Sequence, residues 1–171
     1  MGKATLYLML GYPGAGKTTT AKIIADLTGA VHLWADNERR RRYGEPTYAH
    51  EENLHLYGIL NEETAQLLAQ GQSVIFDTGF NYYADRQRLR RIAESHGADC
   101  LVVWLTTHKQ VAKERATNNA HLQETRVLGN FKETDFERIS ENLEPPRPDE
   151  EYVELDGTKI TPEYVTEQLQ L

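Results

Sequence analysis

The amino-terminal part of the chain reads Leu6-Tyr7-Leu8-Met9-Leu10 and then Gly11-Tyr12-Pro13-Gly14-Ala15-Gly16-Lys17-Thr18-Thr19. The second stretch fills every fixed position of the pattern G-x-x-x-x-G-K-[ST], between an apolar run and a helix-forming run. Glycines at these positions let successive backbone N–H groups point into one concavity that suits phosphate oxygens. The helix that follows adds the positive end of its dipole. We therefore expect residues 11–19 to bind the phosphates of a nucleotide.

Two side chains of this loop are expected to act directly on the nucleotide. Lys17 can reach the β- and γ-phosphates, and the hydroxyl group of Thr18 can bind Mg²⁺. The alternative is a glycine-rich turn with an incidental lysine, which a complete match between a strand and a helix disfavours. The sequence thus predicts a site for ATP, or a close relative of ATP, together with Mg²⁺.

A second carboxylate completes the expected magnesium site. Val74-Ile75-Phe76-Asp77 reads as an apolar strand that ends in aspartate. In open α/β sheets ligands collect at the carboxyl ends of the strands, where an acidic group can hold Mg²⁺ through its water shell. The alternative is that Asp77 caps the turn before Gly79.

Asp36 follows another apolar segment, 19 residues after Lys17, and Arg39 comes three residues later. A carboxylate facing the γ-phosphate can accept the proton of an incoming hydroxyl group, and an arginine beside it can bind substrate phosphate. The other interpretation makes Asp36 a helix N-cap and residues 38–42 a solvated, charged helical face. The residue types alone leave both interpretations open.

Short apolar runs alternate with longer amphipathic segments along the chain, which is typical of an α/β fold with a parallel sheet. The pattern predicts a single domain over residues 1–171. The predicted strands are Leu6–Leu10, Val31–Trp34, Ser73–Asp77, Leu101–Leu105 and Tyr152–Leu155, and the predicted helices cover residues 17–28, 50–70, 83–96, 108–116, 133–142 and 162–170.

Residues 116–134 do not fit this alternation, because they are polar and only weakly periodic. A segment of this length inside a compact domain is expected to be either disordered or a functional flap. Earlier in the chain, Tyr43, Tyr48 and residues 80–83 predict an aromatic, polar surface near the strand ends. Arg86 and Arg90 lie one helical turn apart, so they are expected to face either one ligand or solvent.

The composition of the chain limits the kinds of partner that we expect it to bind. The formal net charge of −7 disfavours nucleic acid as a general partner without excluding a local basic patch. No run is long enough to span a membrane, and the lone Cys100 inside an apolar run fits a core position in a reducing cytoplasm. His50 and His55 are five residues apart, which on a helix prevents them from sharing one zinc ion.

The motifs together resemble a group of small P-loop kinases. The matching features are residues 11–18, the pair Asp36 and Arg39, the stretch 71–80 and the segment Glu144-Pro145-Pro146. The group includes the kinase half of polynucleotide kinase, the zeta toxins, chloramphenicol phosphotransferase and AAA-type ATP-binding proteins of bacteria. The resemblance implies a P-loop NTPase three-layer sandwich, with helices on both faces of a five-stranded sheet in the order 2-3-1-4-5.

The resemblance also implies roles for individual residues. Asp36 would be the general base, and Arg39 would bind the acceptor, together with Phe80. The flap would act as a lid over the triphosphate, with Arg126 on the γ-phosphate and Arg115 either in the lid or stacked on adenine. The group's lids often carry several arginines, whereas this flap has Asn118, Asn119 and His121.

These features predict an ATP-dependent kinase that transfers a phosphoryl group to a hydroxyl group. The acceptor is a small molecule, a nucleotide or a nucleic-acid 5′ end, and no residue pattern distinguishes between them. The alternatives are a P-loop ATPase or nucleotide-dependent switch whose only acceptor is water, and a degenerate nucleotide-binding module. The presence of Lys17, Thr18 and Asp77 disfavours the degenerate module.

Overall fold

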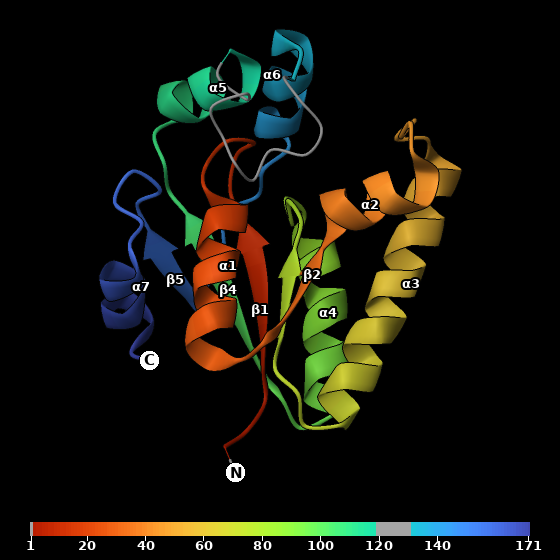
Figure 1. Ribbon diagram of the computed structural model, residues 1–171, viewed down its shortest axis with the longest axis vertical. Helices are drawn as coiled ribbons and strands as arrows, with labels where there is room; N and C mark the ends of the chain where they lie inside the picture. Colours follow the sequence, from red (N-terminus) through yellow and green to blue (C-terminus); the bar gives the residue numbers. More distant parts are fainter. Residues whose placement is uncertain (1, 119–130) are drawn as a thin grey trace.

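The computed structural model describes residues 2–118 and 131–171. Within them, five parallel strands form one sheet in the order β2-β3-β1-β4-β5 (Figure 1). This confirms the predicted sheet order. The strands are β1 (Thr5–Leu10), β2 (Val31–Trp34), β3 (Val74–Asp77), β4 (Asp99–Leu105) and β5 (Tyr152–Leu155).

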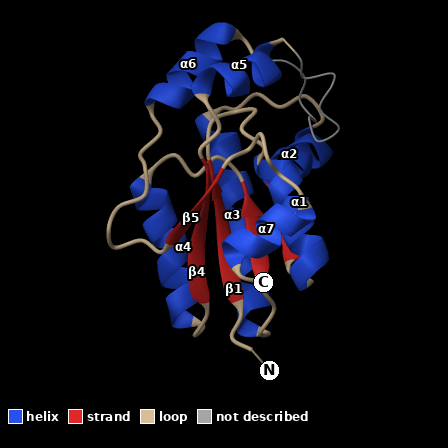
Figure 2. Cartoon of the chain, turned by 90° about the vertical axis from the view of Figure 1, so that its left-hand side faces the viewer, coloured by secondary structure: helices blue, strands red, loops and turns tan. Residues whose placement is uncertain are grey.

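Helices cover both faces of the sheet and its carboxyl edge. α1 and α7 lie on one face, α3 and α4 lie on the other, and α5 and α6 lie beyond the strand ends (Figures 1 and 2). The described helices are α1 (Lys17–Thr28), α2 (Ala35–Tyr43), α3 (His50–Ala69), α4 (Tyr83–Ser95), α5 (Lys109–Thr117), α6 (Glu133–Glu141) and α7 (Pro162–Leu169).

β1 lies at the centre of the sheet and is buried on both faces. Leu6, Leu8 and Leu10 pack against the α3 and α4 side, whereas Tyr7 and Met9 pack against α1 and α7. Successive side chains of a strand point to opposite faces, so a strand buried on both faces reads as a continuous apolar run. This central position brings the carboxyl end of β1, and the loop after it, to the middle of the sheet edge.

α2 is not among the helices predicted from periodicity, but it confirms the helix that the alternative interpretation of Asp36 placed over residues 38–42. It follows β2 directly, and its sequence carries polar or charged side chains almost all the way round. A helix without an apolar stripe has no periodicity to detect. The N-cap position belongs to Trp34, so the interpretation of Asp36 as the N-cap is wrong; Asp36 lies in the first turn.

α5 and α6 pack against each other over the phosphate loop. Ala112, Ala116 and Phe136 form a small buried cluster between them, and Lys113 Nζ lies 2.7 Å from Glu133 and 2.9 Å from Glu137. These two helices flank the segment predicted as a flap. No described helix is both long and apolar enough to cross a lipid bilayer.

Candidate active site at the carboxyl edge of the sheet

The loop between β1 and α1 has the backbone of a phosphate cradle. Gly14 and Gly16 have φ angles of 81° and 106°, which side-chain-bearing residues rarely adopt, and Gly16 is the N-cap of α1. The backbone N–H of Ala15 donates to the carbonyl oxygen of Tyr12 at 3.0 Å and tightens the turn. The positive end of α1 therefore faces the concavity of the loop.

The carbonyl oxygens of this loop are bonded to other parts of the protein. The hydroxyl group of Thr107 donates to Ala15 O at 2.7 Å, that of Thr20 donates to Gly16 O at 2.8 Å, and Arg115 Nη1 contacts Gly14 O at 3.4 Å. The carbonyl oxygens of the loop therefore accept hydrogen bonds from other groups of the protein. The loop thus fits the phosphate groups of a nucleotide, which bind to backbone N–H groups.

Two neighbouring elements press closely on the loop. A Cβ atom at Gly14 would collide with the carbonyl oxygen of Ala112 in α5, and a Cβ atom at Gly157 would collide with that of Ala15. Gly157 belongs to the connection between β5 and α7. The loop conformation is therefore determined by α5 and by the β5–α7 connection as well as by its own glycines.

Lys17 lies over the loop that it belongs to. Its ammonium group donates to the carbonyl oxygens of Gly11 and Tyr12, each at 2.9 Å. This places a positive charge next to the cradle, as binding of a polyphosphate requires. Among the neighbouring residues Pro13 is buried, Thr18 is half-buried and Thr19 is exposed.

Asp77 is the last residue of β3, and its side chain is only 3% exposed. One carboxylate oxygen lies 2.9 Å from His32 Nε2, and the imidazole ring of His32 stacks on Trp34 at 5.8 Å with an angle of 7° between the planes. The carboxylate is therefore held in one orientation beside β1. Its oxygen atoms and the Thr18 hydroxyl are the hard ligands that suit Mg²⁺, so the residues present fit this ion.

His32 is a site residue that sequence reasoning missed. The available signal was the two-residue period of β2, which puts His32 and Trp34 on one face. The register that pairs Trp34 with Asp77 is visible only in the folded sheet. That register also brings Asp36, two residues beyond Trp34, to the same edge as Asp77, where Asp36 is half-buried in the first turn of α2.

Arg39 does not lie open to a ligand. Its side chain is 3% exposed, Nη1 lies 2.6 Å from Glu52 Oε1, and Nη2 donates to Asn53 Oδ1 at 2.8 Å. The prediction that Arg39 binds an acceptor phosphate therefore needs correction, because its charge is already neutralised within the protein. The pair instead joins α2 to α3.

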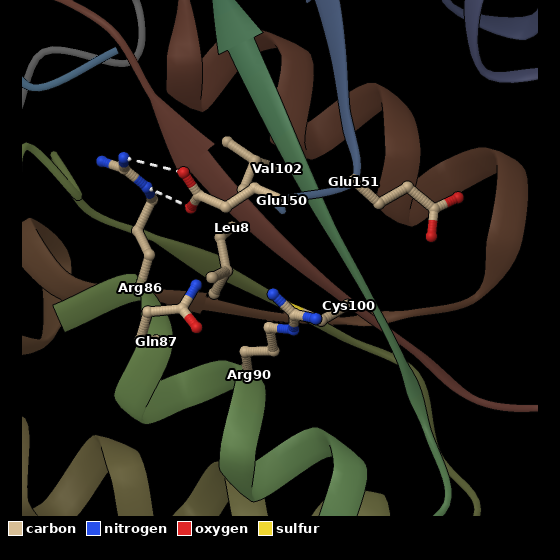
Figure 3. Close-up of a pocket in the computed structure, with 8 residues that line it drawn as sticks. All are labelled: Leu8, Arg86, Gln87, Arg90, Cys100, Val102, Glu150 and Glu151. Atoms are coloured by element: carbon tan, nitrogen blue, oxygen red, sulfur yellow. Dashed lines mark hydrogen bonds and ion pairs between the residues drawn. The ribbon is translucent and has the colours of Figure 1, made fainter. Parts of the chain in front are cut away.

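Two further predictions for this region are corrected by burial. Phe80 is 5% exposed and packs edge-on against Phe76 with ring centroids 5.0 Å apart, so it is a core residue and not an open contact for substrate. Arg86 faces neither ligand nor solvent. It is 1% exposed and forms two hydrogen bonds to Glu150, at 2.7 and 3.1 Å (Figure 3).

The cavity beside Arg86 is structural. It measures about 10 Å³, enough for one water molecule at most, and Cys100 is one of its lining residues (Figure 3). Burial raises the pKa of the Cys100 thiol to about 12, which keeps this side chain protonated at neutral pH. The cavity is lined by Leu8, Arg86, Gln87, Arg90, Cys100, Val102, Glu150 and Glu151.

Of the two arginines predicted for the lid, the structure describes only Arg115. Arg115, in the last turn of α5, donates to the carbonyl oxygens of Gly14 and Gly157 at 3.4 and 3.2 Å, so it lies against the phosphate loop. Arg126 lies outside the described residues. In the described part of the chain, no three His, Cys, Asp or Glu side chains gather as a metal-binding group.

Comparisons with known proteins agree with this geometry. A family model described as an AAA domain matches residues 6–146, while no curated protein matches the chain. A sugar kinase from Janibacter sp. HTCC2649 has a TM-score of 0.69 at 21% identity, covering 99% of this chain and 95% of that one. A gluconokinase from Sinorhizobium meliloti 1021 has a TM-score of 0.65 at 21% identity, covering 98% and 90%.

A third solved structure was determined with ligands. The APS kinase of Mycobacterium tuberculosis, in complex with AMPPNP and APS, has a TM-score of 0.71 at 15% identity, covering 99% of this chain and 98% of that one. Identities this low establish similarity of fold and not of substrate. The match over residues 6–146 shows that the chain belongs to the AAA domain family, and its fold is that of the small P-loop kinases.

Proposed function

We propose that the protein is an ATP-dependent kinase that transfers the γ-phosphate of ATP to a hydroxyl group. The observation that carries this proposal is the grouping of three features at one edge of the sheet. These are the phosphate loop with Lys17, the buried carboxylate of Asp77, and the half-buried carboxylate of Asp36. A simple nucleotide-binding module needs only the first two features, whereas a kinase also needs a group such as the third to accept the proton of the acceptor hydroxyl.

In the proposed reaction the loop binds the triphosphate of ATP, and Lys17 neutralises charge on its β- and γ-phosphates. Asp36 accepts the proton of the acceptor hydroxyl while the hydroxyl oxygen forms a bond to the γ-phosphorus. The bond between that phosphorus and the β–γ bridging oxygen breaks, and ADP leaves. Thr18 and Asp77 would hold Mg²⁺, which supplies further neutralisation of the phosphate charge.

Arg115 supports the nucleotide part of this proposal. Its contacts with Gly14 and Gly157 put a guanidinium group next to the loop from the side of α5. Because α5 and α6 flank the predicted lid, Arg115 and Arg126 are the arginines proposed to cover the triphosphate. The role of Arg126 remains a prediction from the sequence.

Transfer of a radioactive label tests the proposal directly. The purified full chain is incubated with Mg²⁺ and γ-³²P-labelled ATP across sugars, polyols, nucleosides and 5′-hydroxyl oligonucleotides. A labelled organic product is expected, and its formation should require Lys17 and Asp36. Release of label only as inorganic phosphate at the same rate with every acceptor would favour an ATPase and contradict the kinase.

A further inference from the structure

The carboxylate of Glu52, in the first turn of α3, is surrounded by donors from α2 and the α2–α3 connection. Oε1 lies 2.6 Å from Arg39 Nη1, and Oε2 accepts from the backbone N–H and the hydroxyl group of Thr47 at 2.9 and 2.8 Å. The backbone N–H of Tyr48 adds a 3.4 Å contact. The Glu52 side chain is only 8% exposed, so this carboxylate is built into the fold.

The guanidinium group of Arg39 is enclosed by the same region. Besides Glu52 and Asn53, the aromatic ring of Tyr48 lies 4.5 Å from it, and that of Tyr57 lies 5.9 Å away. Tyr48 has a left-handed backbone with φ of 57°, which bends the connection around the pair. A guanidinium group binds a phosphate or carboxylate through its N–H edge. In this chain Glu52 binds Nη1 and Asn53 binds Nη2, while the buried Nε has no hydrogen-bond partner among the described residues.

This pair lies beside the group that is proposed to activate the acceptor. Asp36 and Arg39 are three residues apart on α2, which makes them neighbours on the helix surface. We infer that Glu52 is a built-in counterion that fills the anion position next to Asp36, so that the phosphoryl acceptor is a neutral hydroxyl compound, without phosphate or carboxylate at this position. The inference rests on the proposed kinase activity and specifies its substrate class.

An anionic acceptor could enter this position only in unfavourable ways. It would have to displace Glu52, leaving a buried carboxylate without its cation, or lie beside Glu52 as a second negative charge. Two of the three other arginines of α2 are also paired with a carboxylate of the chain, whereas Arg40 is exposed. Arg41 and Arg42 contact Glu38, at 2.6 and 3.3 Å.

Paired acceptors provide the first test. Phosphoryl transfer by the full chain is compared for glucose and glucose 6-phosphate, and for adenosine and adenosine 3′-monophosphate. Whichever pair is used by the enzyme, kcat/KM is expected to be at least about tenfold higher for the neutral member, which corresponds to about 1.4 kcal/mol. A preference for the phosphorylated member would overturn the inference.

A matched pair of variants provides the second test. Glu52→Gln removes the carboxylate that neutralises Arg39, and Glu38→Gln removes one that contacts only exposed arginines in the same region. The ratio of the two kcat/KM values is expected to shift at least about tenfold towards the phosphorylated acceptor in Glu52→Gln and to stay constant in Glu38→Gln. An unchanged ratio in a folded Glu52→Gln protein would overturn the inference.

A binding measurement separates this inference from the kinase proposal. Inorganic phosphate is titrated calorimetrically into each protein with the nucleotide site saturated by ADP. Glu52→Gln is expected to bind phosphate at least about tenfold more tightly than the native chain and Glu38→Gln. Equal affinities contradict the counterion role even if phosphoryl transfer occurs, whereas failure to label any acceptor contradicts only the kinase.

Discussion

Asp36 and Lys17 occupy different parts of the edge and are proposed to do different work there. Lys17 contacts the phosphate loop itself, whereas Asp36 lies on α2, after a strand at the margin of the sheet. A residue that binds the nucleotide should affect affinity and rate together. A residue that only removes a proton from the acceptor should affect the rate alone.

Asp36→Asn is therefore expected to reduce the rate of phosphoryl transfer by about 10²- to 10⁴-fold, the usual contribution of a general base. The dissociation constant of ATP, measured by calorimetry, should stay within about twofold because no phosphate contact is lost. Lys17→Ala serves as the contrast, since it should weaken ATP binding as well. An active Asp36→Asn enzyme would leave Asp36 a purely structural role in the first turn of α2.

Glu52 makes a prediction about acid stability. Burial raises the pKa of this carboxyl group, but donors from Thr47, Arg39 and Tyr48 outweigh burial and hold the pKa at about 2, below the ordinary 4.5. Because the folded-state pKa is lowered, the stabilisation is present above pH 4.5 and is lost as the pH falls towards 2.

The native chain should therefore lose its advantage in melting temperature over Glu52→Gln progressively as the pH falls from about 5 to about 2. Above that range the advantage should be constant with respect to this group. Melting followed by circular dichroism at several pH values provides the measurement. A difference that does not change with pH would show that the carboxylate is not held ionised by these donors.

Some residues of the candidate site could be identified from the sequence, and others could not. The loop with Lys17 is a local pattern, so its residues could be identified without knowing what lies around them. The partners of Asp77 and Arg39 could not, because His32 comes from a neighbouring strand and Glu52 from another helix. Arg39 matched the expected spacing from Asp36, but spacing carries no information about whether a cation already has a partner.

At the scale of elements, the phosphate loop depends on two segments distant in sequence. α5 packs on Gly14, and the connection between β5 and α7 packs on Ala15 through Gly157. The hydroxyl group of Thr107, after β4, holds the carbonyl oxygen of Ala15. The loop therefore keeps this conformation only if Thr107, α5 and the connection between β5 and α7 are in place.

Gly157→Ala tests this dependence. The new methyl group would collide with the backbone of the loop at Ala15, so ATP affinity is expected to fall at least about tenfold. Gly58→Ala is the control, because a Cβ atom there meets nothing within 4 Å, and it should raise stability by about 0.5–1 kcal/mol without changing affinity. Calorimetric titration and thermal melting measure the two effects, and equal ATP affinities in both variants would contradict the dependence.

The helices and strands differ in how clearly an apolar period in the sequence predicts them. The five strands and most helices carry apolar residues at regular intervals, because they are buried against the sheet. α2 has almost none, since only Ala35 and Arg39 are buried on it, and one of these is a charged residue paired with Glu52. A helix held in place by an ion pair and aromatic contacts leaves no hydrophobic period to recognise.

At the scale of the whole molecule, the nucleotide site lies where several independent elements meet. β1, β3, α1 and α5 all contribute to it, so ligand binding should resist separation of these elements. The fold could be predicted because a central apolar strand, the loop after it and the alternation of segments agree with one another. The acceptor site could not, because its character depends on side-chain pairing between α2 and α3.

Binding of ATP with Mg²⁺ is expected to stabilise the protein by mass action. At a ligand concentration about 100 times the dissociation constant the gain is about 2.7 kcal/mol. For a chain of this size that corresponds to a rise in melting temperature of roughly 5–10 °C. Removal of Mg²⁺ with EDTA should reduce the rise, and Lys17→Ala should remove most of it; an equal rise in Lys17→Ala would place the nucleotide elsewhere.

The central position of β1 in the sheet also matters while the protein is being synthesised. Its partners in the sheet, β3 and β4, begin at residues 74 and 99, so β1 has both of its neighbours only after about a hundred further residues have been synthesised. Until then an uninterrupted apolar segment has no sheet to join, and such segments are prone to aggregation. We therefore expect the risk of aggregation through β1 to last during synthesis until β4 has been made.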